Sequence, residues 1–109
     1  MNHQDLTGIW DLVETFEGEP THRYRLEIKE TGEILLDKQG RILKGVYSIN
    51  ETGDHISLAI ANFDSVEGSV VSYLGDLFLG KIFGRMKSLD VQGQWVNRGT
   101  WAAAKISNA

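Results

Sequence analysis

The chain has 109 residues, enough for one domain with a hydrophobic core of its own. It contains no cysteine, which excludes disulfides, thiolate nucleophiles and Cys-ligated zinc. The formal net charge is -4, which argues against nucleic acid as a partner because that binding depends on clustered Lys and Arg. The polar start and the lack of an apolar run of ~18 to 20 residues predict a cytoplasmic protein with no membrane contact.

Two strands open the expected order of elements. The first covers residues 8–18 and places Trp10, Leu12 and Phe16 on one side. The second covers residues 22–32 and shows the period-two alternation of a strand with one buried and one solvated face. Its apolar residues Tyr24, Leu26 and Ile28 alternate with Arg23, Arg25, Glu27 and Lys29.

Glycine-containing turn signals then recur at short intervals, and they divide the middle of the chain into further strands. Each of these glycines tolerates the positive φ of a tight turn. The turn signals lie around Gly32, Gly40, Gly53 and Gly68, and the expected strands between them are residues 33–38, 42–50 and 55–63. This spacing predicts an antiparallel meander, because parallel strands would need crossover helices between them.

Residues 69–89 fit two descriptions. Apolar residues at positions 70, 74, 77 and 78 suit a helical face, but Gly75, Gly80 and Gly84 would each cost a helix about 1 kcal/mol relative to alanine. We expect two strands, with the helix as the alternative. A strand over residues 76–87 places one apolar set, Phe78, Ile82 and Met86, opposite a second set, Leu77, Leu79 and Phe83.

The second of these sets predicts an interaction surface. If Ile82 and Met86 face the core, then Leu77, Leu79 and Phe83 face outward as a contiguous apolar patch. We expect this patch to join identical chains in a homo-oligomer. The alternative is that the N-terminal segment of the same chain covers it.

Each of the three tryptophans follows a glycine by two positions, as Gly8-x-Trp10, Gly93-x-Trp95 and Gly99-x-Trp101. The Asn-Arg-Gly at 97–99 predicts a three-residue hairpin loop that pairs residues 91–96 with 100–106 and sets Trp95 opposite Trp101. If the meander closes on itself, the first and last strands become neighbours, and Trp10 joins the other two indoles at one end.

The Gly-x-Trp on the first strand, the C-terminal GTWAAAKI and the strand rhythm resemble the calycin barrels, which comprise lipocalins, fatty-acid-binding proteins and avidins. The resemblance implies one all-β domain over residues 1–109, an up-and-down antiparallel meander closed into a small barrel of about eight strands. It also implies that Trp10 plugs one barrel end beneath a late-strand arginine, here Arg85 or Arg98. The biotin-contacting residues of avidins have no counterparts in this sequence, so biotin binding is not implied.

The expected function is non-enzymatic binding of a small, largely apolar molecule inside the barrel. The sequence has no nucleophile elbow or triad, its histidines (His3, His22 and His55) are isolated, and we expect neither a cofactor nor a metal site. The alternative is a structural module with a filled barrel that self-associates through residues 77–83. The predicted ligand-binding residues are Trp10, Tyr24, Leu26, Tyr47, Trp95 and Trp101.

The alternation of the first strand places a charged residue, Glu14, inside. Strict alternation puts it on the face of Trp10 and Phe16, where it would be a polar contact for a ligand or, in an isomerase or lyase, an acid-base group. A bulge or a frayed strand end would instead return it to water. Asp76, on the face of Phe78, is a weaker case of the same kind.

Overall fold

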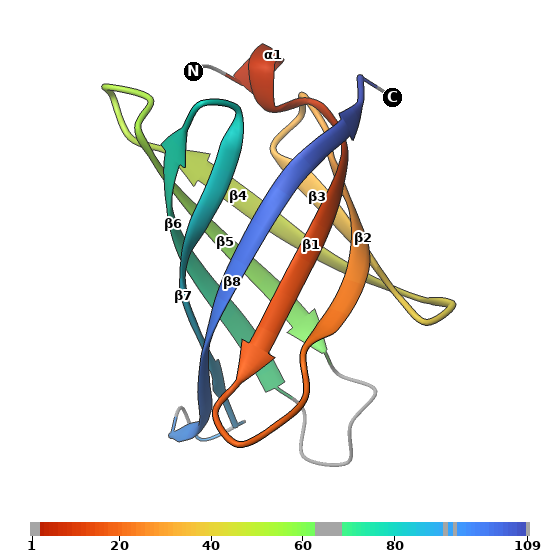
Figure 1. Ribbon diagram of the computed structural model, residues 1–109, viewed down its shortest axis with the longest axis vertical. Coiled ribbons are helices and arrows are strands. Elements are labelled where there is room, and N and C mark those ends of the chain that lie inside the picture. Colours follow the sequence, from red (N-terminus) through yellow and green to blue (C-terminus); the bar gives the residue numbers. More distant parts are fainter. Residues whose placement is uncertain (1–2, 63–68, 91, 93, 109) are drawn as a thin grey trace.

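Eight antiparallel strands form a closed barrel, as the sequence predicted (Figure 1). The computed structural model describes residues 3–62, 69–90, 92 and 94–108. Each strand pairs with the next along the chain, and the last strand returns to pair with the first. The elements are α1 (His3–Leu6), β1 (Gly8–Phe16), β2 (His22–Ile28), β3 (Glu33–Lys38), β4 (Arg41–Ile49), β5 (His55–Asn62), β6 (Ser69–Phe78), β7 (Lys81–Leu89) and β8 (Trp95–Ser107).

Alternating side chains fill the barrel interior, because every second residue of a strand points to the same face of the sheet. On β2, Tyr24 and Leu26 are buried, whereas Arg23 and Arg25 are exposed. The predicted turns at Gly32, Gly40 and Gly53 are confirmed, each with positive φ, and the one at Gly68 lies outside the described residues. The most deeply buried aliphatic side chains include Leu12, Leu26, Ile34, Leu58, Ile60 and Ile82.

Residues 69–89 form two strands, so the helical alternative is wrong, and the turn between the strands lies inside the predicted strand 76–87. Leu79 and Gly80 both have positive φ, 52° and 76°, the backbone of a two-residue type I′ turn. The turn interrupts the alternation of inward and outward side chains, which begins again in β7. Phe78 therefore points outward at the end of β6 and does not share the buried face of Ile82 and Met86.

The C-terminal hairpin predicted at residues 97–99 is wrong. β8 runs through this segment unbroken and pairs with β7 on one side and β1 on the other. Gly99 is needed there for close approach, because a Cβ on it would lie 2.2 Å from the backbone oxygen of Thr15 on β1. The turn comes earlier, where the Asp90 carboxylate accepts hydrogen bonds from the backbone N–H groups of Gln92 and Gln94, both at 2.9 Å.

Helix α1 covers one end of the barrel (Figure 1). Leu6 is fully buried there, and its backbone oxygen accepts a 2.8 Å hydrogen bond from the indole Nε1 of Trp10. The side chain of Lys105 on β8 also donates to the backbone oxygen of Asp5, at 2.9 Å. Within the described residues, no helix is both long enough and apolar enough to span a membrane.

The first and last strands lie side by side as predicted, but the tryptophans do not gather at one end. Their positions along the barrel follow from strand register. Trp10 pairs with Lys105 near the capped end, whereas Trp101 pairs with Glu14 farther along the same two strands. Trp95 precedes Trp101 on the same strand and therefore cannot oppose it.

Candidate functional site

The residues predicted to contact a ligand belong to the packed interior. The structure buries five of them and does not describe the side chain of the sixth, Trp95. None of the five lines either of the two hollows described below. Their contact with a ligand therefore stays a prediction. The five buried residues are Trp10, Tyr24, Leu26, Tyr47 and Trp101.

Glu14 points into the barrel, and the outward alternative is wrong. Its side chain lies on a regular stretch of β1 paired with β2 and β8, so no bulge turns it to water, and only 2% of its surface is exposed. One carboxylate oxygen, Oε2, accepts a 2.8 Å hydrogen bond from the Tyr73 hydroxyl. The other, Oε1, lies 3.8 Å from the Lys38 ammonium.

Tyr24 completes the surroundings of this carboxylate. The Lys38 ammonium lies 5.2 Å from the centre of the Tyr24 ring, over its face. Burial raises the pKa of the Tyr73 hydroxyl well above its usual value, and the charge of Glu14 raises it further. Burial also raises the pKa of the Tyr24 hydroxyl, and the charge of Glu14 raises it to a smaller extent. We call Glu14, Tyr24, Lys38 and Tyr73 the Glu14 cluster.

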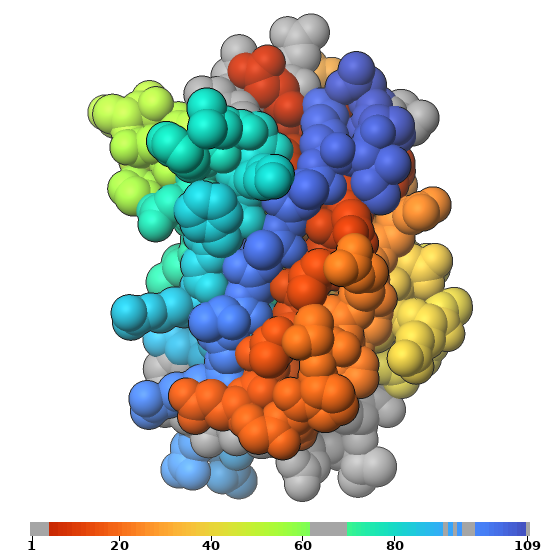
Figure 2. Space-filling view, viewed as in Figure 1, coloured from red at the N-terminus to blue at the C-terminus, as the bar shows by residue number. Residues whose placement is uncertain are grey.

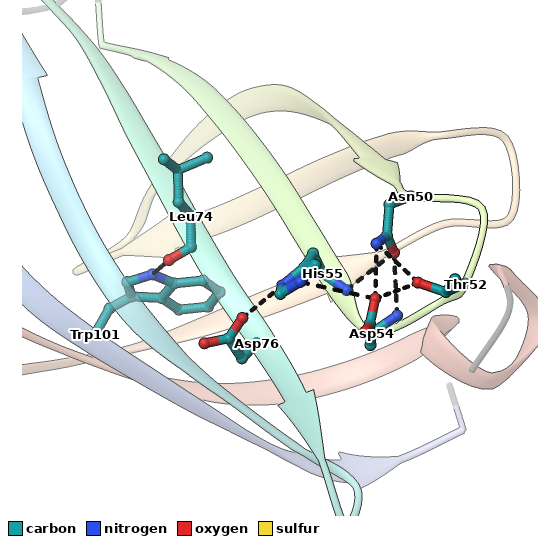
Figure 3. A network of polar contacts seen from close by, with 7 residues as sticks. All are labelled: Asn50, Thr52, Asp54, His55, Leu74, Asp76 and Trp101. Carbon is teal, nitrogen blue, oxygen red and sulfur yellow. Dashed lines mark hydrogen bonds and ion pairs between the residues drawn. The ribbon is translucent and has the colours of Figure 1, made fainter.

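Trp101 packs against this cluster from β8. Its ring meets Tyr73 edge to face, with the ring centres 5.4 Å apart. Its Nε1 donates a 3.1 Å hydrogen bond to the backbone oxygen of Leu74, as Figure 3 shows. The indole therefore lies across β7 onto β6, over two paired glycines, Gly84 and Gly75. A Cβ on Gly75 would come within 2.6 Å of the indole, so the glycine gives the ring its space.

Sequence reasoning missed Tyr73 and Lys38 as members of the cluster. Tyr73 shares the inward face of β6 with Val71 and Gly75, so alternation alone could have placed it inside. Its contact with Glu14, 59 positions away, depends on how the barrel closes. Lys38 carried no signal, because a lysine at a strand end is usually solvated.

The first hollow, of about 830 Å³, lies against the outer wall of the barrel. Thr15 and Thr100 line it and point away from the interior, since their chain neighbours Glu14 and Trp101 are buried. Figure 2 shows the face where β8 and β1 run together above the β1–β2 loop. The lining includes apolar Phe16, Leu74 and Met86, hydroxyl-bearing Thr15, Ser72 and Thr100, and charged Glu17, Glu19, Arg85, Lys87 and Arg98.

The second hollow, of about 700 Å³, continues around the wall and shares Leu74 and Arg85 with the first. His55 and Asp76 border it, and the His55 Nδ1 lies 2.5 Å from an Asp76 carboxylate oxygen (Figure 3). His55 is therefore not isolated, and Asp76 points outward rather than into the barrel.

The β4–β5 turn beside the second hollow holds its own polar network (Figure 3). The Asp54 carboxylate accepts hydrogen bonds from the Thr52 hydroxyl and, at 2.6 Å, from the Asn50 amide, and these bonds lower the pKa of Asp54. The His55 Nε2 lies 3.9 Å from the same carboxylate. Among the hydrogen bonds of the described residues, none brings a serine or threonine hydroxyl to the His55 ring.

The predicted interface residues divide between the two faces of the sheet. Leu79 at the β6–β7 turn is 85% exposed, and Phe83 on β7 is also exposed. Leu77 is not on this surface, because it packs against the core from the inward face of β6. Phe78, predicted to be buried, takes its place beside the turn.

Comparison with known proteins adds no relative. No protein-family model matches the chain, and no curated protein is similar to it in sequence. The barrel is consistent with the calycin resemblance, but the arginine that it implied is absent from the tryptophan end: Arg85 and Arg98 point outward around the first hollow, and Lys105 pairs with Trp10. No three His, Asp or Glu side chains converge as metal ligands would in the part of the chain that the structure describes.

Proposed function

We propose that the protein binds a small, largely apolar molecule without catalysing a reaction, and that the ligand lies in the first hollow. The observation that carries this is the hollow itself: its volume of about 830 Å³ is that of a small-molecule site. Leu74, the outward-pointing apolar side chain of its lining, would contact the body of the ligand. The Thr15 and Thr100 hydroxyls and the Arg85 guanidinium would orient a polar end.

This proposal keeps the ligand class expected for a calycin-like barrel and moves the site from the interior to the outer wall. Buried apolar side chains form a core in the interior, whereas the first hollow lies on the outer wall beside the β1–β2 loop and is open to solvent. Arg85 has no hydrogen bond or ion pair among the described residues, so its guanidinium is available to an anionic group.

The test uses 1-anilinonaphthalene-8-sulfonate, an apolar fluorescent probe that carries one anionic group. Leu74→Glu places a charge in the hollow at an already exposed position and should weaken binding about tenfold or more, equivalent to ~1.4 kcal/mol. Val46→Glu is the matched control, since Val46 is exposed on β4 and lines neither hollow. Equal probe binding by the two variants would contradict the proposed site. Native mass spectrometry of protein from its own host would identify a retained ligand.

A second candidate function is self-association through the β6–β7 turn, and the conformation of Leu79 favours it. A type I′ turn prefers Asn or Gly at this position, because a leucine with positive φ is strained. Leu79 has this strained backbone, and its apolar side chain is 85% exposed. Burial of the side chain against a second copy of the chain would offset both costs. Phe78 on β6 and Phe83 on β7, the strands that the turn joins, are also large exposed apolar side chains.

Sedimentation equilibrium tests this candidate. Wild type should associate at micromolar concentration, and Phe83→Glu should remain monomeric, while Val46→Glu should associate like wild type. Both substitutions introduce the same charge on an exposed part of a strand. A monomeric wild type, or equal association by the two variants, would refute the role of this surface.

A further inference from the structure

A buried carboxylate needs a reason, because a charged side chain is rarely taken out of water without full compensation. Glu14 is buried and makes one close hydrogen bond, from Tyr73 to Oε2. Its other oxygen, Oε1, has the Lys38 ammonium at 3.8 Å, beyond the 2.7 to 3.2 Å of an N–H···O bond. Oε1 is thus turned toward a cation that it holds only loosely.

The same ammonium lies on an aromatic face. Lys38 Nζ is 5.2 Å from the centre of the Tyr24 ring, within the ~6 Å range of a cation–π interaction. A carboxylate and the face of an aromatic ring therefore meet around one ammonium group. This pairing also recognises free amines, since the carboxylate neutralises the charge and the ring packs against the adjoining carbon atoms.

Lys38 reaches this position from the edge of the barrel. It is the last residue of β3, directly before the β3–β4 turn, and its side chain is 28% exposed, compared with 3% for Glu14. Its ammonium makes no hydrogen bond among the described residues. The lysine stem thus marks a route from solvent to the carboxylate, and its ammonium is free to leave along that route.

We propose that the Glu14 cluster is a binding site for small amines with an apolar body, and that Lys38 is its tethered occupant. A ligand ammonium would displace that of Lys38 and donate a hydrogen bond of ordinary length to Oε1. Its alkyl part would lie along the path of the lysine stem, against the Tyr24 ring. This site is inside the barrel, so it is independent of the first hollow, which lies on the other side of the wall formed by β1 and β8.

Competition by Lys38 sets the expected affinities. A protein whose site is occupied by its own lysine binds a ligand with an affinity reduced by the fraction of open sites. Lys38→Met keeps most of the stem and removes the charge, so it should bind an amine at least about tenfold tighter than wild type. Glu14→Gln preserves the shape of the side chain and removes the charge, and it should abolish binding.

The experiment is an NMR titration with n-butylammonium chloride, with 1-butanol at matched ionic strength as the neutral probe. The Trp101 indole N–H signal reports on the site because the ring contacts Tyr73. Lys44→Met is the control for the lost charge, because Lys44 is exposed on β4, outside the cluster. We expect butylammonium to shift the Trp101 signal, butanol to leave it unchanged, and Lys44→Met to match wild type.

Two results would overturn the proposal: equal shifts with butanol and butylammonium, or equal amine affinity in Lys38→Met and Lys44→Met. If Glu14→Gln does not fold, Tyr24→Leu supplies the second test, since it retains the carboxylate and removes the aromatic face. It should weaken butylammonium binding several-fold. Unchanged affinity in that variant would remove the ring from the site and contradict the cation–π contact.

Discussion

Gly75 should be intolerant of even one added carbon atom because of Trp101. In Gly75→Ala the new Cβ would lie 2.6 Å from the indole Cζ2 and 2.7 Å from Cγ2 of Ile82, about 1 Å closer than an ordinary carbon contact. The indole cannot easily retreat, because Leu74 holds its Nε1 and Tyr73 packs on its ring. We expect the substitution to lower the free energy of unfolding by about 1 to 3 kcal/mol.

A double-mutant cycle assigns this cost to the indole. Trp101→Phe withdraws the far ring from Gly75, so Gly75→Ala should cost about 1 kcal/mol less in that background than in wild type, while the contact with Ile82 remains. Gly84→Ala is the control, since its Cβ would meet the backbone oxygen of Leu74, which no change at Trp101 removes.

Urea unfolding followed by far-UV circular dichroism measures all of these variants without relying on tryptophan fluorescence. The reasoning would be refuted if Gly75→Ala cost the same with and without the full indole. It would also fail if Trp101→Phe relieved Gly84→Ala as much as Gly75→Ala.

Further predictions follow from the tyrosines, the strained turn, the cap and a surface ion pair. The pKa of the Tyr73 hydroxyl is higher in the folded protein than in the unfolded chain, where it is about 10. Its contribution to stability is therefore fully present below about pH 10. Above that pH the free energy of unfolding should fall by up to ~1.4 kcal/mol per pH unit. In urea titrations, Tyr73→Phe should have a shallower decline, and identical slopes would contradict this. Leu79→Asn should raise the free energy of unfolding by about 1 kcal/mol, because asparagine tolerates positive φ; a loss of stability would count against the turn assignment. Leu6→Ala should lower the free energy of unfolding by about 2 to 4 kcal/mol and red-shift tryptophan emission. Unchanged stability would show that the cap is dispensable. Arg23→Ala should lower the free energy of unfolding by less than ~1 kcal/mol in the same assay, since its 2.7 Å ion pair with Asp11 is exposed. A larger loss would contradict the small contribution expected of this ion pair.

Local sequence pattern was sufficient for the barrel architecture. Alternation identified most strands, and glycines marked the turns at Gly32, Gly40 and Gly53, which left an antiparallel meander as the arrangement that buries one face of every strand. Gly99 misled the prediction, because glycine serves both tight turns and close strand contacts. Only the position of Thr15 on the neighbouring strand distinguishes these uses.

The candidate site was less accessible to sequence reasoning. Alternation placed Glu14 on the inward face, but its partners Tyr73 and Lys38 come from strands whose distance across the barrel is fixed only by closure. The first hollow lies on the outer wall, where the sequence shows only a mixture of polar and apolar residues. Its concave shape arises from the course of the strands and the β1–β2 loop, which no residue pattern encodes directly.

The pairing of β1 with β8 also has consequences for how fast the chain folds. Seven of the eight strand pairings join neighbours in the chain through connecting segments of moderate length, whereas this one brings Ile9 to Ser107 and Phe16 to Gly99. Contacts between such distant residues carry the largest loop-closure entropy and slow folding. We therefore expect the seam between β1 and β8 to limit the folding rate, so that substitutions there change folding kinetics more than equally destabilising ones within the local hairpins.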